Sequence, residues 1–446
     1  MTEVRPSGLL AQPASAKARK SGCLRTGLTY AAIAVTTSLL TILVINLAPQ
    51  PRVLRSIVPH RFDSADPQFA KTMSSFSQGQ LFSSNAVQTL VNGDEIFPSM
   101  LQAIRVAHST IDIETYIYWS GAVGYEFATS LAAKAKEGVE VRVLVDWVGS
   151  LPFDEDLIQI MTRAGVTFER YRPIHWYTLD RVNNRTHRRL LIVDGRVAFT
   201  GGVGIADNWR GNARNPDEWR DTHYRIEGMA VPAFQAAFAQ NWLETTGESL
   251  QGEKFYPAPE PAGELDAQLI LSSQPNGSQD VELMMLTAIA AAQGHLRIGM
   301  AYFVPDDIAL QQILEARDRG VSVDVLVPNS LTDVPLTRHG SRYFWGALLQ
   351  AGVRIFEFQP TMYHPKLLIV DDVWSSFGSV NLDERSLRLN DEATLNVYGK
   401  DFAKTQIDLF NQDLQRSRQI SLEEWQARSL REKMTDWLAS RLRSQL

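Results

Sequence analysis

The sequence has little cysteine and no large excess of either charge. Cys23 is the only cysteine among 446 residues, which excludes an internal disulfide framework and a cysteine-based zinc cluster. An HExxH motif and a cluster of carboxylates, the usual signs of a metal hydrolase, are also missing. The 44 basic residues face 50 acidic ones, for a net charge of −6. We therefore expect no uniformly basic nucleic-acid-binding surface, although a local basic cleft is compatible with this balance.

Long apolar runs are missing too, except for residues 28–48, which read LTYAAIAVTTSLLTILVINLA. This run carries no charge, and as a helix it would extend roughly 31 Å, close to the thickness of a bilayer core. It follows a basic tail, residues 1–27. We predict a transmembrane anchor at 28–48, with a cleaved signal peptide or a buried core helix as alternatives. The basic excess before the run favours a cytoplasmic N-terminus.

The rest of the chain shows alternating structure after a polar stretch. Residues 49–84 are rich in proline, serine, glutamine and aspartate and are predicted to be a linker. Helical spacing of apolar residues at 94–108 and 124–137 then alternates with strand-like runs at 111–119 and 141–147. This alternation indicates an α/β fold with a mixed sheet flanked by helices.

The alternating pattern occurs twice. The repeated segments are EGVEVRVLV (137–145) with RGVSVDVLV (319–327), and HRRLLIVD (187–194) with HPKLLIVD (364–371). A repeat of roughly 180 residues indicates domain duplication, since solenoid repeats are far shorter. We predict two α/β half-domains, 85–250 and 265–410, packed about a pseudo-two-fold axis. The first copy has about ten more residues before its histidine, including Trp176 and Tyr177, which form either a substrate-contacting loop or an ordinary surface excursion.

The repeated HxK segment is the part of the sequence that indicates chemistry. His364 and Lys366 lie two residues apart, so an extended backbone presents both side chains on one face. Ser379 and Asn381 have the same spacing and can add hydrogen-bond donors. A cation and neutral donors suit a phosphate group. A histidine beside phosphorus can attack it or protonate a leaving oxygen.

Two HxK segments with a shared downstream pattern, HxKxxxxD and then GSxN, resemble the phospholipase D superfamily and, within it, the bacterial cardiolipin synthases. The similar stretches are IDIETYIYW, VRVLVDWVGS, THRRLLIVDGRVAFTGG, EWRDTHYRIEG, AYFVPDD and FGSVNLDERSLRLNDEA. The resemblance extends over about residues 85–410. It implies two phospholipase D-like half-domains that share one site. One histidine would form a phosphohistidine, while the other protonates the leaving alcohol and deprotonates the incoming one.

The resemblance also implies individual roles. His187 is expected to be the nucleophile and His364 the acid and base. Asp194 and Asp371 would orient or polarise the histidines or pair with basic groups. The phosphate-binding residues would be Arg189, Lys366, Ser379 and Asn381. No metal or other cofactor is implied.

The first copy departs from this pattern at three positions. Arg189 stands in place of lysine, which keeps the charge and allows bidentate contact with phosphate. Gly202 and Gly204 stand where the second copy has Ser379 and Asn381, which removes two donors. The first motif is therefore either active or decayed.

Three functions follow from these alternatives. The first is a membrane-anchored phosphatidyltransferase that condenses two phosphatidylglycerols to cardiolipin and glycerol. The second is a phospholipase D-type hydrolase, and the third is a non-catalytic lipid-binding homologue. A nuclease is disfavoured by the acidic net charge, so the expected partners are a phospholipid, phosphatidylglycerol above all, and a membrane, without nucleic acid. The expected location is the bacterial inner membrane, with the catalytic region on the exoplasmic side.

Other positions gain interest from the repeat. Asp221 and Glu392 occupy matching places and are predicted either to pair with a histidine on a facing strand or to be solvated surface acids. Glu114, Tyr116 and Tyr302 end matching strands and are candidates for the pocket wall, with a core position as the alternative. The C-terminal segment, 411–446, is predicted to form an amphipathic helix that either lies on anionic lipid or packs on the catalytic region.

Overall fold

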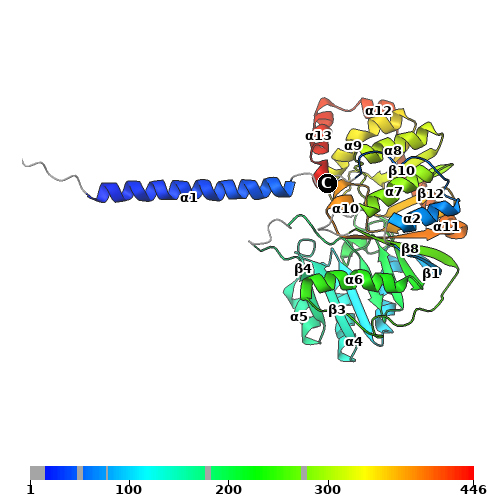
Figure 1. The fold of residues 1–446 in the computed structure, drawn as a ribbon, viewed down its shortest axis with the longest axis horizontal. Coiled ribbons are helices and arrows are strands. Elements are labelled where there is room, and N and C mark those ends of the chain that lie inside the picture. The colour runs from blue at the N-terminus through cyan, green and yellow to red at the C-terminus, as the bar shows by residue number, and fades with distance from the viewer. Residues whose placement is uncertain (1–15, 48–53, 77–78, 176–181, 273–278) are drawn as a thin grey trace, which may run out of the picture. The chain divides into compact units, whose positions relative to one another are not determined.

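A computed structural model describes residues 16–47, 54–76, 79–175, 182–272 and 279–446 of this chain. The chain divides into two compact units, Met1–Ala48 and Pro49–Leu446. Helix α1 (Ala16–Leu47) belongs to the first unit and is drawn in blue in Figure 1. None of the helices in the described ranges is long and apolar enough to cross a membrane. Helix α1 includes the apolar run up to Leu47, but the predicted membrane span is not confirmed.

The second unit holds both copies of the repeat. The strands of the first copy are β1 (Leu81–Val91), β2 (Thr110–Thr115), β3 (Glu140–Asp146), β4 (Thr167–Tyr171), β5 (Leu190–Val193), β6 (Val197–Gly201) and β7 (Thr222–Gly228). Its helices are α3 (Asn92–Arg105), α4 (Ala122–Lys136), α5 (Glu155–Arg163), η2 (Asp207–Trp209) and α6 (Val231–Thr246).

The second copy has a matching set of elements. Its strands are β8 (Leu265–Ser272), β9 (His295–Met300), β10 (Ser322–Pro328), β11 (Arg354–Phe358), β12 (Lys366–Val370), β13 (Trp374–Gly378), β14 (Glu392–Tyr398) and β15 (Ser417–Ile420). Its helices are α7 (Asp280–Ala291), α8 (Asp307–Asp318), α9 (Pro335–Gln350), α10 (Glu384–Arg388) and α11 (Lys400–Gln415). The chain ends with α12 (Leu422–Gln426), α13 (Leu430–Ser440) and η3 (Arg443–Gln445).

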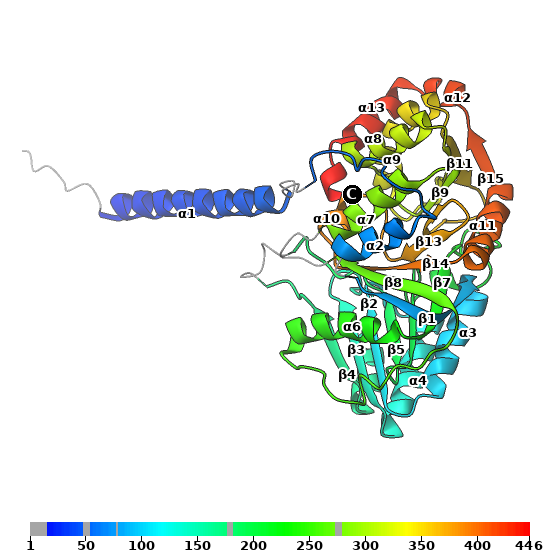
Figure 2. The same ribbon diagram turned by 45° about the vertical axis from the view of Figure 1, so that its right-hand side comes forward.

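The order of strands in the sheet reproduces the repeat. One 15-stranded sheet runs β15-β11-β10-β9-β12-β13-β14-β8-β1-β7-β6-β5-β2-β3-β4. Read outward from the antiparallel β1·β8 pair, each half has the same order, and β15 is added at one edge. Figure 2 shows β8 and β1 at the boundary between the halves. In each half two neighbouring pairs, such as β2·β3 and β3·β4, are parallel, so the sheet is mixed, as predicted.

Helices cover both faces of the sheet. In the first half, α3, α4 and α5 bury apolar side chains such as Phe127 against one face. In the second half, α7 and α8 do the same. The third apolar cluster includes α6 and α11 and takes residues from both halves, with the rings of Tyr224 and Phe377 stacked at 3.5 Å between centroids. Burial of such large rings stabilises the contact between the halves.

The prediction of a linker at 49–84 was wrong for residues 67–76 and 81–84, which lie in regular elements, whereas the described residues 54–66 contain no helix or strand. Residues 67–76 form α2 (Pro67–Phe76), and β1 begins at Leu81. Phe69 and Met73 of α2 are buried in the core of the second half. The polar composition concealed a short amphipathic helix, in which Phe69 and Met73 lie four residues apart on one face. This segment is a structural part of the second half.

Candidate active site

Two short backbone bridges between the halves position the two special histidines. His187 and His364 stand just before β5 and β12, the strands formed by the repeated LLIV runs. The His187 N–H donates to the carbonyl of Asp391 at 2.8 Å, and the His364 N–H donates to the carbonyl of Arg220 at 2.8 Å. Because each bridge joins opposite halves, each histidine lies beside the acid that follows its bridge partner.

The acids pair with the histidines across the halves. Nδ1 of His187 lies 2.9 and 3.0 Å from the carboxylate oxygens of Glu392. Nδ1 of His364 lies 2.7 Å from Oδ2 of Asp221. All four residues are buried. A carboxylate accepts a hydrogen bond from Nδ1–H, which leaves the lone pair of each imidazole on Nε2. The histidine of one half is thus oriented by the acid of the other.

Two buried cations face the free ring nitrogens. Nη2 of Arg189 lies 2.8 Å from Nε2 of His187, and Nζ of Lys366 lies 3.0 Å from Nε2 of His364. The Lys366 ammonium also donates to the carbonyl of His364 at 2.7 Å. A phosphate held by both cations would lie next to both imidazoles, where charge-assisted hydrogen bonds are strongest.

Charged groups from both halves act on the two imidazoles. Burial, together with the positive charges of Arg189, Lys366 and His364, holds the pKa of His187 well below its usual value. Burial and the Lys366 ammonium lower the pKa of His364 to about 4, against the opposing effect of Asp221. Burial and the Arg189 guanidinium lower the pKa of Lys366 to about 7. Groups from both halves therefore act on the same imidazoles, and an anion would relieve their mutual repulsion.

The two acids differ in their ionisation. Burial raises the pKa of Glu392 to about 7, although a hydrogen bond from Ser379 opposes it. Burial also acts to raise the pKa of Asp221, but the charges of His364 and Lys366 outweigh it and the net shift is downward. An ionised Asp221 stabilises a protonated His364 better than Glu392 stabilises a protonated His187.

Aromatic rings enclose the histidines. The ring centroid of Tyr116 lies 5.3 Å from that of His187, and Tyr302 lies 6.4 Å from His364, so both candidates for the pocket wall are beside the site. The ring centroids of Trp209 and Trp219, which the sequence pattern did not single out, lie 5.3 and 5.7 Å from that of His364. Trp219 stands in EWRD, two residues before Asp221, and this proximity was the available signal.

The remaining polar candidates lie near the site in supporting positions. Glu114 is fully buried and accepts hydrogen bonds from Thr186 at 2.5 Å and from Asn241 at 2.6 Å, so it supports the residue before His187 and does not line the pocket. Oδ1 of Asn381 accepts from the Tyr302 N–H at 3.2 Å. The Ser379 hydroxyl accepts from the Ala393 N–H at 3.0 Å.

Asp194 and Asp371 are not placed beside the histidines. The carboxylate of Asp194 accepts hydrogen bonds from the backbone N–H groups of residues 108–110, at 2.7 to 3.2 Å. Asp371 does the same for residues 293–295 in the other half. Both aspartates have a positive φ, near 50°, at the turn after their strand. Among the described contacts neither aspartate meets His187 or His364, contrary to the expectation that they orient these histidines, because β5 and β12, of four and five residues, carry them to the far end of the strand.

Steric crowding explains why glycine occupies positions 202 and 204 of the first motif. A Cβ on Gly202 would lie 2.2 Å from Oδ1 of Asp221, and a Cβ on Gly204 would lie 2.9 Å from Cβ of Ile117. The Asp221 carboxylate also accepts from Nε1 of Trp209 at 2.8 Å. Trp209 thus supports Asp221, as Ser379 supports Glu392. Glycine at position 202, where the second copy has Ser379, leaves room for the Asp221 carboxylate, which is hydrogen-bonded by Trp209 instead of a serine.

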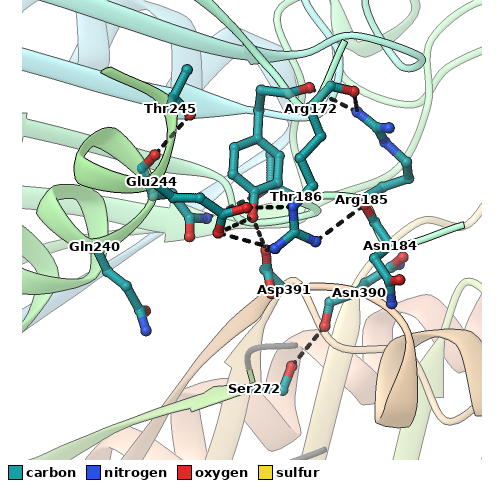
Figure 3. A network of polar contacts seen from close by, with 12 residues as sticks. Arg172, Asn184, Arg185, Thr186, Gln240, Glu244, Thr245, Ser272, Asn390 and Asp391 are labelled. Atoms are coloured by element: carbon teal, nitrogen blue, oxygen red, sulfur yellow. Dashed lines mark hydrogen bonds and ion pairs between the residues drawn. The ribbon is translucent and has the colours of Figure 1, made fainter. Parts of the chain in front are cut away.

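The segment before His187 is held against the second half. Figure 3 shows Arg172 and Glu244 close to Asp391. Nε of Arg172 donates to Glu244 at 2.7 Å, and the Tyr171 hydroxyl donates to Asp391 at 2.6 Å. These contacts brace the backbone bridge that positions His187. Trp176 and Tyr177 of the insertion lie outside the described residues.

Comparison with known proteins identifies the family. The sequence matches the family described as "Cardiolipin synthase, PLD-like domain" over residues 100–215 and 285–414. Cardiolipin synthase 2 of Bacillus anthracis is 34% identical over 352 residues, which cover 78% of this chain and 68% of the relative. Cardiolipin synthase A of Pseudomonas putida is 32% identical, covering 79% of this chain and 74% of the relative.

Solved structures share the fold. The crystal structure of phosphatidylserine synthase from Haemophilus influenzae superposes with a TM-score of 0.66 at 15% identity, covering 85% of this chain and all of that one. Polyphosphate kinase from Porphyromonas gingivalis superposes with a TM-score of 0.52 at 14% identity, covering 88% of this chain and 57% of that one. At these identities the likeness concerns the fold alone. The family resemblance seen in the sequence is thus confirmed, and the chain belongs to the cardiolipin synthase family, with a phospholipase D-like domain.

Proposed function

We propose that this protein is a phosphatidyltransferase that condenses two phosphatidylglycerol molecules into cardiolipin and glycerol through a phosphohistidine. The observation that carries the proposal is the crossed pairing of two buried histidines with acids of the opposite half, each histidine facing a cation. The relatives named cardiolipin synthase support the choice of substrate and product. A lipid substrate also implies that the protein works at a membrane, here the bacterial inner membrane, and the exoplasmic placement stays a prediction.

The first step uses both histidines. Nε2 of neutral His187 attacks phosphorus, so that a P–N bond forms while the P–O bond to the terminal glycerol breaks. Protonated His364 supplies the proton that the leaving glycerol oxygen takes. Phosphate binding engages Arg189 and Lys366, and their charge then no longer opposes protonation of His364. The ionised Asp221 favours this imidazolium, which supports His187 as nucleophile and His364 as acid.

The second step reverses the roles of acid and base. The terminal glycerol hydroxyl of a second phosphatidylglycerol gives its proton to His364 and attacks phosphorus. The P–N bond breaks, and cardiolipin leaves with both phosphatidyl groups. One phosphodiester replaces another, so the balance requires no nucleotide. Arg189 and Lys366 stabilise the negative charge that the non-bridging oxygens carry in both transition states.

Expression in a bacterial host that lacks cardiolipin tests the reaction. We expect mass spectrometry of the lipids to detect new cardiolipin with the wild-type chain and none with His187→Ala or His364→Ala. His108→Ala is the matched control, since its exposed side chain lies outside the site, and it should retain the product. Phosphatidic acid without cardiolipin would instead show a hydrolase, and unchanged lipids with folded protein would show a non-catalytic homologue.

The covalent intermediate tests the assignment of the two histidines. Rapid denaturation of the wild-type chain soon after mixing with phosphatidylglycerol should trap a phosphatidyl group on His187, because the first step forms the adduct and only the second step consumes it. Digestion and mass spectrometry of the peptide that contains residue 187 would detect it. An adduct on His364 in the wild-type chain would refute the assignment of the nucleophile.

A further inference from the structure

Helix α13 exposes an apolar stripe to solvent. Its members recur at helical spacing near the end of the chain, and we call them the outward face of α13. They are Leu430 (85% exposed), Met434 (59%), Trp437 (42%) and Leu438 (53%) on the helix, with Leu442 (48%) just after its end. Residues three and four apart lie on one side of a helix, so these side chains form one continuous patch. A patch of large exposed apolar residues marks an interaction site.

The opposite face of α13 is firmly held by the domain. Asp436 is buried and accepts from Nδ1 of His339 on α9 at 2.7 Å, and it also pairs with Arg428. Ser429 and Glu432 form a capping box at the start of the helix. The exposed stripe therefore belongs to a helix with a defined inward face, and its exposure is a property of the docked helix.

The charges on α13 are segregated in the same way. Both acids, Glu432 and Asp436, are engaged with Arg342 on the inward side. Glu432 is partly exposed but paired, and the residues of the exposed class that carry charge on and just after the helix are basic: Arg431, Lys433 and Arg441. The Arg441 guanidinium also lies 5.1 Å from the centroid of the Trp437 ring. An apolar stripe flanked by cations and containing an indole suits an interface between apolar chains and anionic headgroups.

The tail after α13 is tied to the loops around the active site. The Arg385 N–H donates to the carbonyl of Leu446 at 3.0 Å, and Nδ2 of Asn183 donates to Gln445 at 2.7 Å. Asn183 precedes His187 in the first half, and Arg385 follows Asn381 in the second. A membrane surface bound to α13 would therefore lie close to the segments around Asn183 and Arg385, which flank the active site.

We propose that the outward face of α13 docks on the surface of an anionic phospholipid bilayer. The leucines, the methionine and the indole enter the boundary between headgroups and acyl chains, while the basic residues contact lipid phosphates. Docking goes beyond the proposed reaction, because it requires neither histidine. It places the loops around the site next to the phase in which a phospholipid substrate is concentrated.

Hydrogen–deuterium exchange of the full-length chain tests the docking. With phosphatidylglycerol vesicles we expect slower exchange in the peptide 430–442, and with phosphatidylcholine vesicles little change. Each basic residue near an anionic surface contributes about fivefold to binding. The triple variant Arg431→Gln, Lys433→Gln, Arg441→Gln should therefore require roughly 100-fold more vesicle lipid for the same protection. Leu430→Ser with Met434→Ser and Leu438→Ser should abolish the protection.

The controls separate docking from other causes. Leu151→Ser with Leu243→Ser removes two exposed leucines of the first half and should leave the protection intact. Exchange without vesicles should be the same in all variants, which shows that α13 still folds. Protection without vesicles that rises with protein concentration would assign the face to a second copy of the chain and overturn the proposal. Equal protection by both lipids would also overturn it, and neither result depends on turnover.

Discussion

The substitution Gly202→Ala tests whether the first motif is intact or decayed. The new methyl group would lie 2.2 Å from Oδ1 of Asp221, whereas atoms of this kind approach to roughly 3.4 Å. The carboxylate must retreat by about 1 Å, which lengthens its 2.7 Å contact with His364 beyond a hydrogen bond. A misplacement of about 1 Å in a catalytic group costs on the order of 100-fold in rate, or about 2.7 kcal/mol.

The assay is cardiolipin formation from phosphatidylglycerol by purified protein, followed by mass spectrometry. Gly294→Ala is the matched control, because its methyl group would meet Oδ1 of Asp371 at an ordinary 3.5 Å. We expect this control to keep near wild-type activity. Melting temperatures of both variants check that the fold is retained.

A double-mutant cycle isolates the cause of the loss. If Gly202→Ala acts by displacing Asp221, it should add little to the loss caused by Asp221→Ala, since both changes remove the same interaction. The reasoning is refuted if Gly202→Ala retains wild-type turnover. It is equally refuted if the two losses multiply, because the glycine would then act elsewhere.

Three further predictions follow from the site and its frame. The pKa values of Lys366 and Glu392 are both about 7, so as the pH rises from 6 to 9 the site loses a positive charge and gains a negative one. Calorimetry should show sulfate binding that weakens over this range. Lys366→Arg should reduce that dependence and Lys366→Arg with Glu392→Gln should remove it, whereas a flat wild-type profile would contradict the assignment. Asp194→Ala and Asp371→Ala each remove the acceptor of three backbone N–H groups. Each substitution should lower the free energy of unfolding, measured in urea titrations, by about 3 kcal/mol. Asp372→Ala is the control and should have little effect, because Asp372 is exposed. Phe69→Ala should cost about 3–5 kcal/mol, because its ring packs at 5.7 Å from that of Trp374, and a change near zero would restore the linker interpretation.

Local pattern accounts for much of what the sequence predicted. The family, the two copies and the mixed sheet follow from HxK spacing and from runs such as LLIV, because motifs and alternation depend on residues close together in the chain. Asp194 and Asp371 show the limit of this reasoning. They are part of the motif by spacing, yet the strand that separates them from the histidines carries them to a turn.

The sequence alone singled out two histidines, each followed two residues later by a basic residue, in two matching segments. Tertiary structure decided how these segments combine: Glu392 orients His187 and Asp221 orients His364, each across the boundary between the halves. Partners more than 140 residues apart leave no trace in periodicity, because their contact depends on how the two halves of the chain meet. The same holds for Gly202. Only the tertiary structure shows that the Asp221 carboxylate occupies the space that a side chain at position 202 would need.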